Sequence, residues 1–142
     1  MTVTAAEDLR RWLDAGAELA YNDGHAAAIA LLDTAGLLAD DDIAAFIETA
    51  TVAGRDGQTV RGAWVDWAGL AHAIDTAAIG PDLDGDAVRL LYLAASLAHG
   101  RPVDLRAALF GLDPVHARAA VVAVARATGL TAPGADTNGA GQ

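Results

Sequence analysis

The sequence lacks cysteine and lysine, two residue types that carry much protein chemistry. All nine basic residues are arginines, and no Cys occurs among the 142 residues. The absence of Cys excludes a disulfide framework, a zinc knuckle and a thiol nucleophile. The absence of Lys excludes Schiff-base chemistry and the lysine of a phosphate-binding P-loop. Ser96 is the sole serine, and it falls inside a predicted helix without a residue that would orient a base, so we expect no enzymatic activity.

Positive charge is scarce, because 19 acidic residues give the chain a net charge of −10. The charge is unevenly distributed: residues 1–84 carry a net −11, whereas residues 85–130 carry +2. General nucleic-acid binding requires clustered Lys and Arg, so this balance disfavours it. Opposite charge in the two halves favours either internal packing or a complementary contact between protein chains.

Long hydrophobic runs are also missing. The apolar stretch at residues 90–98 is much shorter than the roughly 18–20 residues that a membrane span needs. Glu7 and Asp8 occupy the place where a secretory leader carries positive charge. We therefore expect a cytoplasmic protein that does not bind membranes.

Helical periodicity and helix-capping residues predict an all-α fold, a compact bundle of six to seven short helices. We expect one domain at residues 1–129 and a disordered tail at 130–142, where periodicity ends. The helices are predicted at 5–21, 25–35, 41–53, about 64–78, 84–99, 104–110 and 114–128. The last of these is apolar almost all round, which predicts a place at the centre of the fold or in an interface.

One segment interrupts the helical pattern between the third and fourth predicted helices. Asp56-Gly57 is a tight-turn sequence, with Thr51-Val52 before it and Thr59-Val60 after it. Residues 51–61 therefore form either a small β-hairpin or an ordered loop, and the sequence does not decide between them, because an isolated hairpin is only marginally stable.

The main functional hypothesis is a non-enzymatic protein–protein interaction or regulatory module that binds another protein or itself, for example as a homodimer. Arg89, Tyr92, Ser96 and His99 recur at helical spacing and share one face, so we expect them to form an exposed interaction stripe. Trp64 and Trp67 are candidate anchors, because tryptophan is common at the energetic centres of interfaces.

The first alternative is a small DNA-binding regulator. Residues 104–128 predict two helices around Gly111, which is typical of a helix-turn-helix. The second helix of this segment would offer His116, Arg118 and Arg126 as nucleic-acid contacts. The apolar character of that helix leaves little polar surface for a DNA groove.

The second alternative is a helical ligand-binding protein or enzyme around His72 or His99. His72 and Asp75 lie three residues apart, as metal ligands on a helix often do. The sequence contains no H-x-x-x-H or E-x-x-H pattern, and residues 82–93 do not have the spacing of an EF-hand. We therefore expect no metal and no cofactor.

The stretch Leu90–Leu112, followed by Asp113, resembles the C-terminal part of small uncharacterised all-helical proteins from actinobacteria. It covers about a sixth of the chain. The resemblance implies a helical fold and an actinobacterial origin, and it implies no activity and no catalytic residue.

Overall fold

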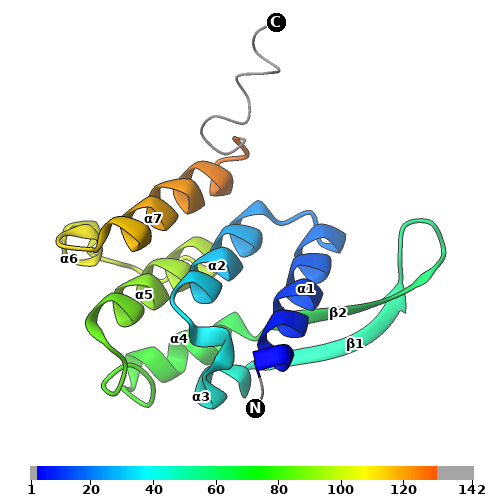
Figure 1. The fold of residues 1–142 in the computed structure, drawn as a ribbon, viewed down its shortest axis with the longest axis horizontal. Helices are drawn as coiled ribbons and strands as arrows, with labels where there is room; N and C mark the ends of the chain where they lie inside the picture. Colours follow the sequence, from blue (N-terminus) through cyan, green and yellow to red (C-terminus); the bar gives the residue numbers. More distant parts are fainter. Residues whose placement is uncertain (1–2, 131–142) are drawn as a thin grey trace, which may run out of the picture.

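The computed structural model describes residues 3–130, which form seven α-helices, one 3-10 helix and one antiparallel pair of strands (Figure 1). The elements in chain order are α1 (Val3–Leu19), α2 (Asp23–Thr34), η1 (Leu37–Ala39), α3 (Asp41–Ala44), β1 (Ile47–Ala53), β2 (Thr59–Val65), α4 (Trp67–Asp75), α5 (Gly85–His99), α6 (Leu105–Leu109) and α7 (Pro114–Ala127). The protein is thus mostly helical, and the all-α prediction is corrected by one hairpin. The predicted tail lies, apart from Leu130, outside the described residues.

Short polar side chains begin six of the helices, and five of them are Asp. Their oxygens accept hydrogen bonds from backbone N–H groups that have no partner inside the helix. The N-cap residues are Asn22, Asp40, Asp66, Asp84, Asp104 and Asp113. Pro114 follows Asp113 at the first turn of α7, where a missing N–H costs nothing. The predicted starts of the last three helices are confirmed.

The predicted helix at residues 41–53 is wrong beyond Ala44. The chain turns into β1 at Ile47, and β1 pairs with β2 in regular register from Ile47↔Val65 to Ala53↔Thr59. Alternating β-branched residues favour the extended strand over a helix, and pairing with a second strand supplies the hydrogen bonds. The segment at 51–61 is therefore a hairpin rather than a loop, and it is longer at both ends than the sequence indicated.

The fourth helix begins at Trp67, because Asp66 caps its N-terminus. Trp64 consequently lies in β2, so the prediction that the fourth helix begins at about residue 64 is wrong. Trp67 is 5% exposed and belongs to the core, whereas Trp64 is half-buried.

Helix α2 occupies the centre of the fold and packs against α1, α5 and α7 (Figure 1). Six of its twelve residues are buried, and three of those are the alanines Ala26, Ala27 and Ala28 in its first half. Helix α7 lies at the outside and buries only Ala120 and Ala123. Of the two places predicted for α7, the centre of the fold is therefore wrong, because α2 fills that position and leaves α7 one covered face. A place in an interface stays a prediction.

Helix α1 packs closely against β2 on the opposite side of α2 from α7. Gly16 is buried there, and a Cβ at this position would overlap the carbonyl oxygen of Ala63. The Nε1 atom of Trp64 lies 2.9 Å from the same point. Only glycine permits this approach, so α1 covers the outer edge of β2 with its own backbone.

Candidate interaction surface on helices α6 and α7

The outward face of α7 is apolar and exposed. Val121 is 62% exposed and Val124 is 43% exposed, although both are aliphatic. Ala117, Val121 and Val124 follow the i, i+4, i+7 spacing that places side chains on one helix face. Because α7 is apolar on nearly all sides but buried on only one, an apolar face of the helix is exposed to solvent.

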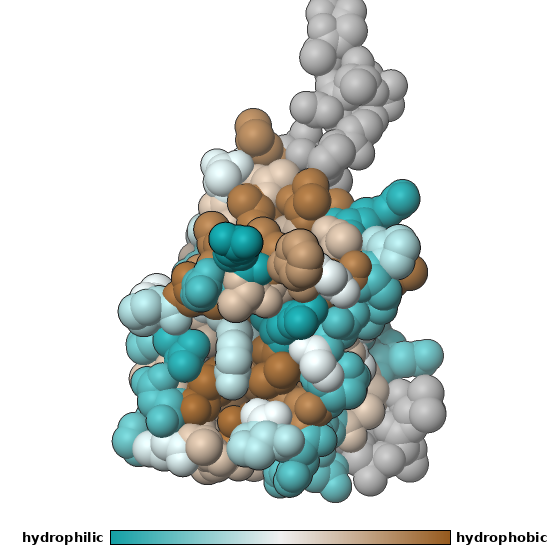
Figure 2. Space-filling model, turned by 90° about the vertical axis from the view of Figure 1, so that its left-hand side faces the viewer, coloured by the Kyte–Doolittle hydropathy of each residue, from teal (hydrophilic) through white to brown (hydrophobic). Residues whose placement is uncertain are grey.

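Helix α6 and the turn that follows it complete this face as a groove. We call it the α6–α7 groove, and its volume is about 350 Å³. It is lined by Leu109, Leu112, Ala117, Ala120, Val121 and Val124. All six lining residues are apolar. Figure 2 shows hydrophobic side chains exposed over the upper half of the molecule, among scattered hydrophilic ones.

Arginines border the groove. Arg106 precedes Leu109 by three residues on α6, and Arg118 precedes Val121 by three residues on α7. Residues at this spacing are surface neighbours on a helix. Both arginines are exposed, and no carboxylate of residues 3–130 forms an ion pair with either. Helix α7 contains no acidic residue, so Arg118 gives its side of the rim positive charge, whereas Arg106 also lines a neighbouring pocket with Asp104.

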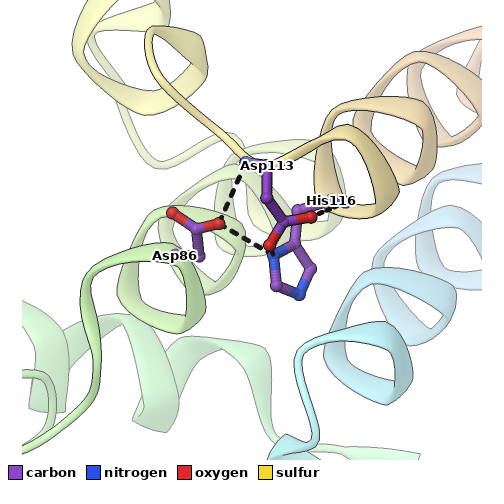
Figure 3. A group of neighbouring side chains, drawn as sticks. All are labelled: Asp86, Asp113 and His116. Atoms are coloured by element: carbon purple, nitrogen blue, oxygen red, sulfur yellow. Dashed lines mark hydrogen bonds and ion pairs between the residues drawn. The ribbon is translucent and has the colours of Figure 1, made fainter.

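A cluster of three ionisable side chains fixes the N-terminus of α7 to α5 (Figure 3). The His116 Nδ1 atom lies 2.8 Å from Asp86 Oδ2 and 2.6 Å from Asp113 Oδ2. The backbone N–H of Asp113 donates to Asp86 Oδ2 at 3.2 Å. Asp113 Oδ1 accepts from the backbone N–H groups of Val115 and His116, which is its capping role. One hydrogen-bonded cluster therefore joins the first turns of two helices.

The electrostatics of this cluster favour a protonated imidazole. The hydrogen bond to Asp86 raises the pKa of His116 above its ordinary value, and the negative charge of Asp113 adds to the shift. The hydrogen bond from His116 lowers the pKa of Asp86, and the bond from the Asp113 N–H lowers it further. The two carboxylates therefore stabilise the cationic form of the His116 imidazole.

The three groups also have the chemistry of a metal site, with one imidazole and two carboxylates within 4.8 Å of one another. In the absence of a metal, the same two carboxylates raise the pKa of the imidazole, and its protonated form makes ion pairs with them. Nδ1 lies within hydrogen-bond distance of both carboxylates, and Asp113 is already engaged as a cap. We therefore interpret the cluster as an ion-pair clamp for α7.

The predicted interaction stripe on α5 is less exposed than expected. Arg89 is half-buried and donates to the carbonyl oxygen of Phe110 at 2.7 Å. Tyr92 is half-buried, and the guanidinium of Arg101 lies 5.0 Å from the centre of its ring. Ser96 is half-buried too, and His99 alone of the four is exposed. The expectation of a fully exposed stripe is corrected, since α6 and its approach cover part of it. A binding role for these residues stays a prediction.

The candidate anchor Trp67 is a core residue, with its ring 6.2 Å from that of His25. Trp64 lies beside Gly62 and Gly16 at the contact between β2 and α1. The structure thus uses both tryptophans for packing. The exposed aromatic side chains are instead Phe110, at the end of α6, and Tyr21, after α1.

The residues predicted to contact nucleic acid have separate surroundings. His116 is engaged in the clamp with Asp86. Arg126 lines a cavity of about 420 Å³ that also contains Asp14, Glu18 and Asp23. Arg118 is exposed beside the groove. Of the three residues, Arg118 alone belongs neither to the clamp nor to the acidic cavity. DNA binding by residues 104–128 stays a prediction.

The histidines of the enzyme alternative lie on exposed parts of two helices, His72 on α4 and His99 at the end of α5. Asp75, the expected companion of His72, instead forms an ion pair with Arg101 at 2.8 Å. The structure therefore does not bring His72 and Asp75 together as a ligand pair.

No protein-family model, curated protein or solved structure matches this chain. The resemblance to actinobacterial helical proteins accordingly stays a prediction. Among residues 3–130, no helix combines the length and apolar character needed to cross a membrane.

Proposed function

We propose that this chain is a non-enzymatic, cytoplasmic interaction module that binds an amphipathic helix of another protein in the α6–α7 groove. The observation that supports the proposal is an exposed groove with an entirely apolar lining, formed by Leu109, Leu112 and one face of α7. Grooves of this kind bind helices whose apolar residues recur every three or four positions. Binding would cover apolar surface that a monomer otherwise exposes to water.

The charge of the rim indicates the chemistry of the partner. Arg106 and Arg118 border the apolar lining, and ion pairs with them would steer and orient an acidic helix. The partner helix is therefore one with Asp or Glu beside its apolar face. A second α7 is a poor occupant, because its charged side chains are arginines as well. Residues 131–142 are unsuitable too, because their sequence contains no large apolar side chain.

The experiment is a selection from a displayed library of helical peptides about 15 residues long, roughly the length of α7. The library keeps an apolar stripe constant and varies the flanking positions among Glu, Gln and Lys. Enriched peptides should carry Glu at the flanks. They should bind the Val121→Asp variant at least about tenfold more weakly than the unmodified chain, a difference of about 1.4 kcal/mol in binding free energy. Failure to enrich any peptide, or equal binding to Val121→Asp, would refute the proposal.

Two further variants separate groove binding from general effects. Val115→Asp introduces the same charge on the same helix at a residue that is 68% exposed and does not line the groove. It should leave peptide binding unchanged. Arg118→Glu reverses the rim charge and should shift selection from Glu-flanked to Lys-flanked peptides. Enrichment of Glu-flanked peptides by Arg118→Glu as strongly as by the unmodified chain would exclude the charged part of the proposal.

A further inference from the structure

Strand β1 has one partner strand and one open edge. It packs mainly against β2, and the hairpin extends beyond the helices (Figure 1). Residues 48–51 are all exposed. The opposite edge of the hairpin, that of β2, is covered by α1 where Gly16 meets the Ala63 carbonyl. Helix α1 thus blocks the β2 edge near Ala63, whereas the β1 edge is open along residues 48–51.

The hydrogen-bond register identifies which backbone groups of β1 point outward. The Asp66 N–H donates to the Phe46 carbonyl at 2.7 Å, and the Gly54 N–H donates to the Gln58 carbonyl at 2.6 Å. Hydrogen-bonded pairs alternate along an antiparallel ladder, so the even-numbered residues of β1 bond to β2. Thr49 and Thr51 must then direct their N–H and C=O groups away from β2. Within residues 3–130, no other backbone group bonds to them.

Strand β1 has one charged residue, Glu48, and otherwise lacks the features that usually protect such an edge. Protected edges carry Lys or Pro, or they are interrupted by a bulge. Strand β1 reads Ile-Glu-Thr-Ala-Thr-Val-Ala, and its seven residues pair with β2 without interruption. A two-stranded sheet is also marginally stable by itself and gains from further strands.

We propose that β1 pairs antiparallel with β1 of a second copy, which makes a four-stranded sheet across a two-fold axis at Ala50. This register places Thr49 opposite Thr51 of the second copy, with their outward N–H and C=O groups facing one another. Glu48, the only charged residue of β1, then lies opposite Val52 rather than opposite its own copy. The register thus places no like charges opposite one another and lets the outward backbone groups of the two copies pair. This inference does not depend on the α6–α7 groove.

The test is the molar mass of the full chain, measured by sedimentation equilibrium over a range of concentrations. The unmodified chain should form a dimer. Thr51→Pro removes an outward N–H without removing a bond to β2, because edge strands tolerate Pro where the N–H faces solvent. It should weaken dimerisation at least about tenfold. A chain that is monomeric at every concentration, or a dimer that Thr51→Pro leaves intact, would overturn the proposal.

Matched controls locate the contact. Thr59→Pro removes an outward N–H from the other strand at an equally exposed residue, and it should leave the dimer intact. Val121→Asp should also leave it intact, which separates this contact from the groove. Amide hydrogen exchange needs no variant: the amides of Thr49 and Thr51 should be protected at high concentration and exchange faster on dilution. Exchange that is fast at all concentrations would contradict the pairing.

Discussion

Replacing Gly16 by alanine tests the close approach of α1 to β2. The added Cβ would overlap the carbonyl oxygen of Ala63, and it would lie 2.9 Å from Trp64 Nε1 and 3.0 Å from Trp64 Cε2. The obstructing atom belongs to the backbone, so it cannot rotate away as a flexible side chain would. Helix α1 and strand β2 must therefore move apart to accommodate one methyl group.

The expected effect of Gly16→Ala is a net loss of stability despite better helix propensity. Overpacking a close contact typically costs about 1–3 kcal/mol. Alanine in a helix interior gains about 1 kcal/mol over glycine. Because the clash is with backbone, we expect the cost to exceed the gain and the free energy of unfolding to fall by up to about 2 kcal/mol.

Urea unfolding followed by tryptophan fluorescence measures this change, as a lower midpoint at unchanged slope. Gly85→Ala is the matched control, because Gly85 begins α5 and a Cβ there would meet no atom within 4 Å. That variant should be as stable as the unmodified chain, or more stable by up to about 1 kcal/mol. A Gly16→Ala protein that gains stability as Gly85→Ala does would show that α1 and β2 do not approach as described.

Two other predictions concern the clamp on α7 and the end of α1. The raised pKa of His116 contributes stability fully below its ordinary value of 6.5, and this contribution is lost as the pH rises through the folded pKa. The lowered pKa of Asp86 contributes above its ordinary value of 3.8 and is lost as the pH falls through the folded pKa. The free energy of unfolding, measured by urea titration, should thus fall from pH 5.5 to 8.5. His116→Asn should remove the part of this fall that His116 contributes, and an unchanged fall in that variant would contradict the clamp. Tyr21 has a left-handed backbone with φ 53°, and its ring lies 4.4 Å from the Arg55 guanidinium. Tyr21→Gly and Tyr21→Ala both lose that contact, but only glycine relieves the backbone strain. Tyr21→Gly should therefore be more stable than Tyr21→Ala by about 1 kcal/mol. Equal stability of the two variants would show that the backbone is unstrained.

Features that depend on neighbouring residues could be predicted from the sequence. Asp84, Asp104 and Asp113 cap helices because a short carboxylate reaches the N–H groups two or three residues later. Gly36 and Gly100 end helices in the left-handed conformation for an equally local reason. These interactions are complete within one turn, so a sequence window contains all that determines them.

Features that depend on distant partners could not be predicted. Residues 47–53 become a strand because residues 59–65 pair with them. Their alanines are compatible with a helix, so the alternation of β-branched residues was not distinct in the sequence. The clamp joins Asp86 to His116 across 30 residues, although the spacing of Asp113 and His116 could have indicated their own contact. The apolar character of α7 did indicate an unsatisfied face, but it could not show whether the core or a partner would cover that face.

The most direct test of the proposed function is to map where a Glu-flanked helical peptide binds the ¹⁵N-labelled full chain. Amide resonances of Leu109, Val121 and Val124 should shift on titration, and the shifts should diminish at high salt because arginines border the groove. Shifts confined to the α5 stripe between Arg89 and His99, with the α6–α7 groove unaffected, would contradict the account.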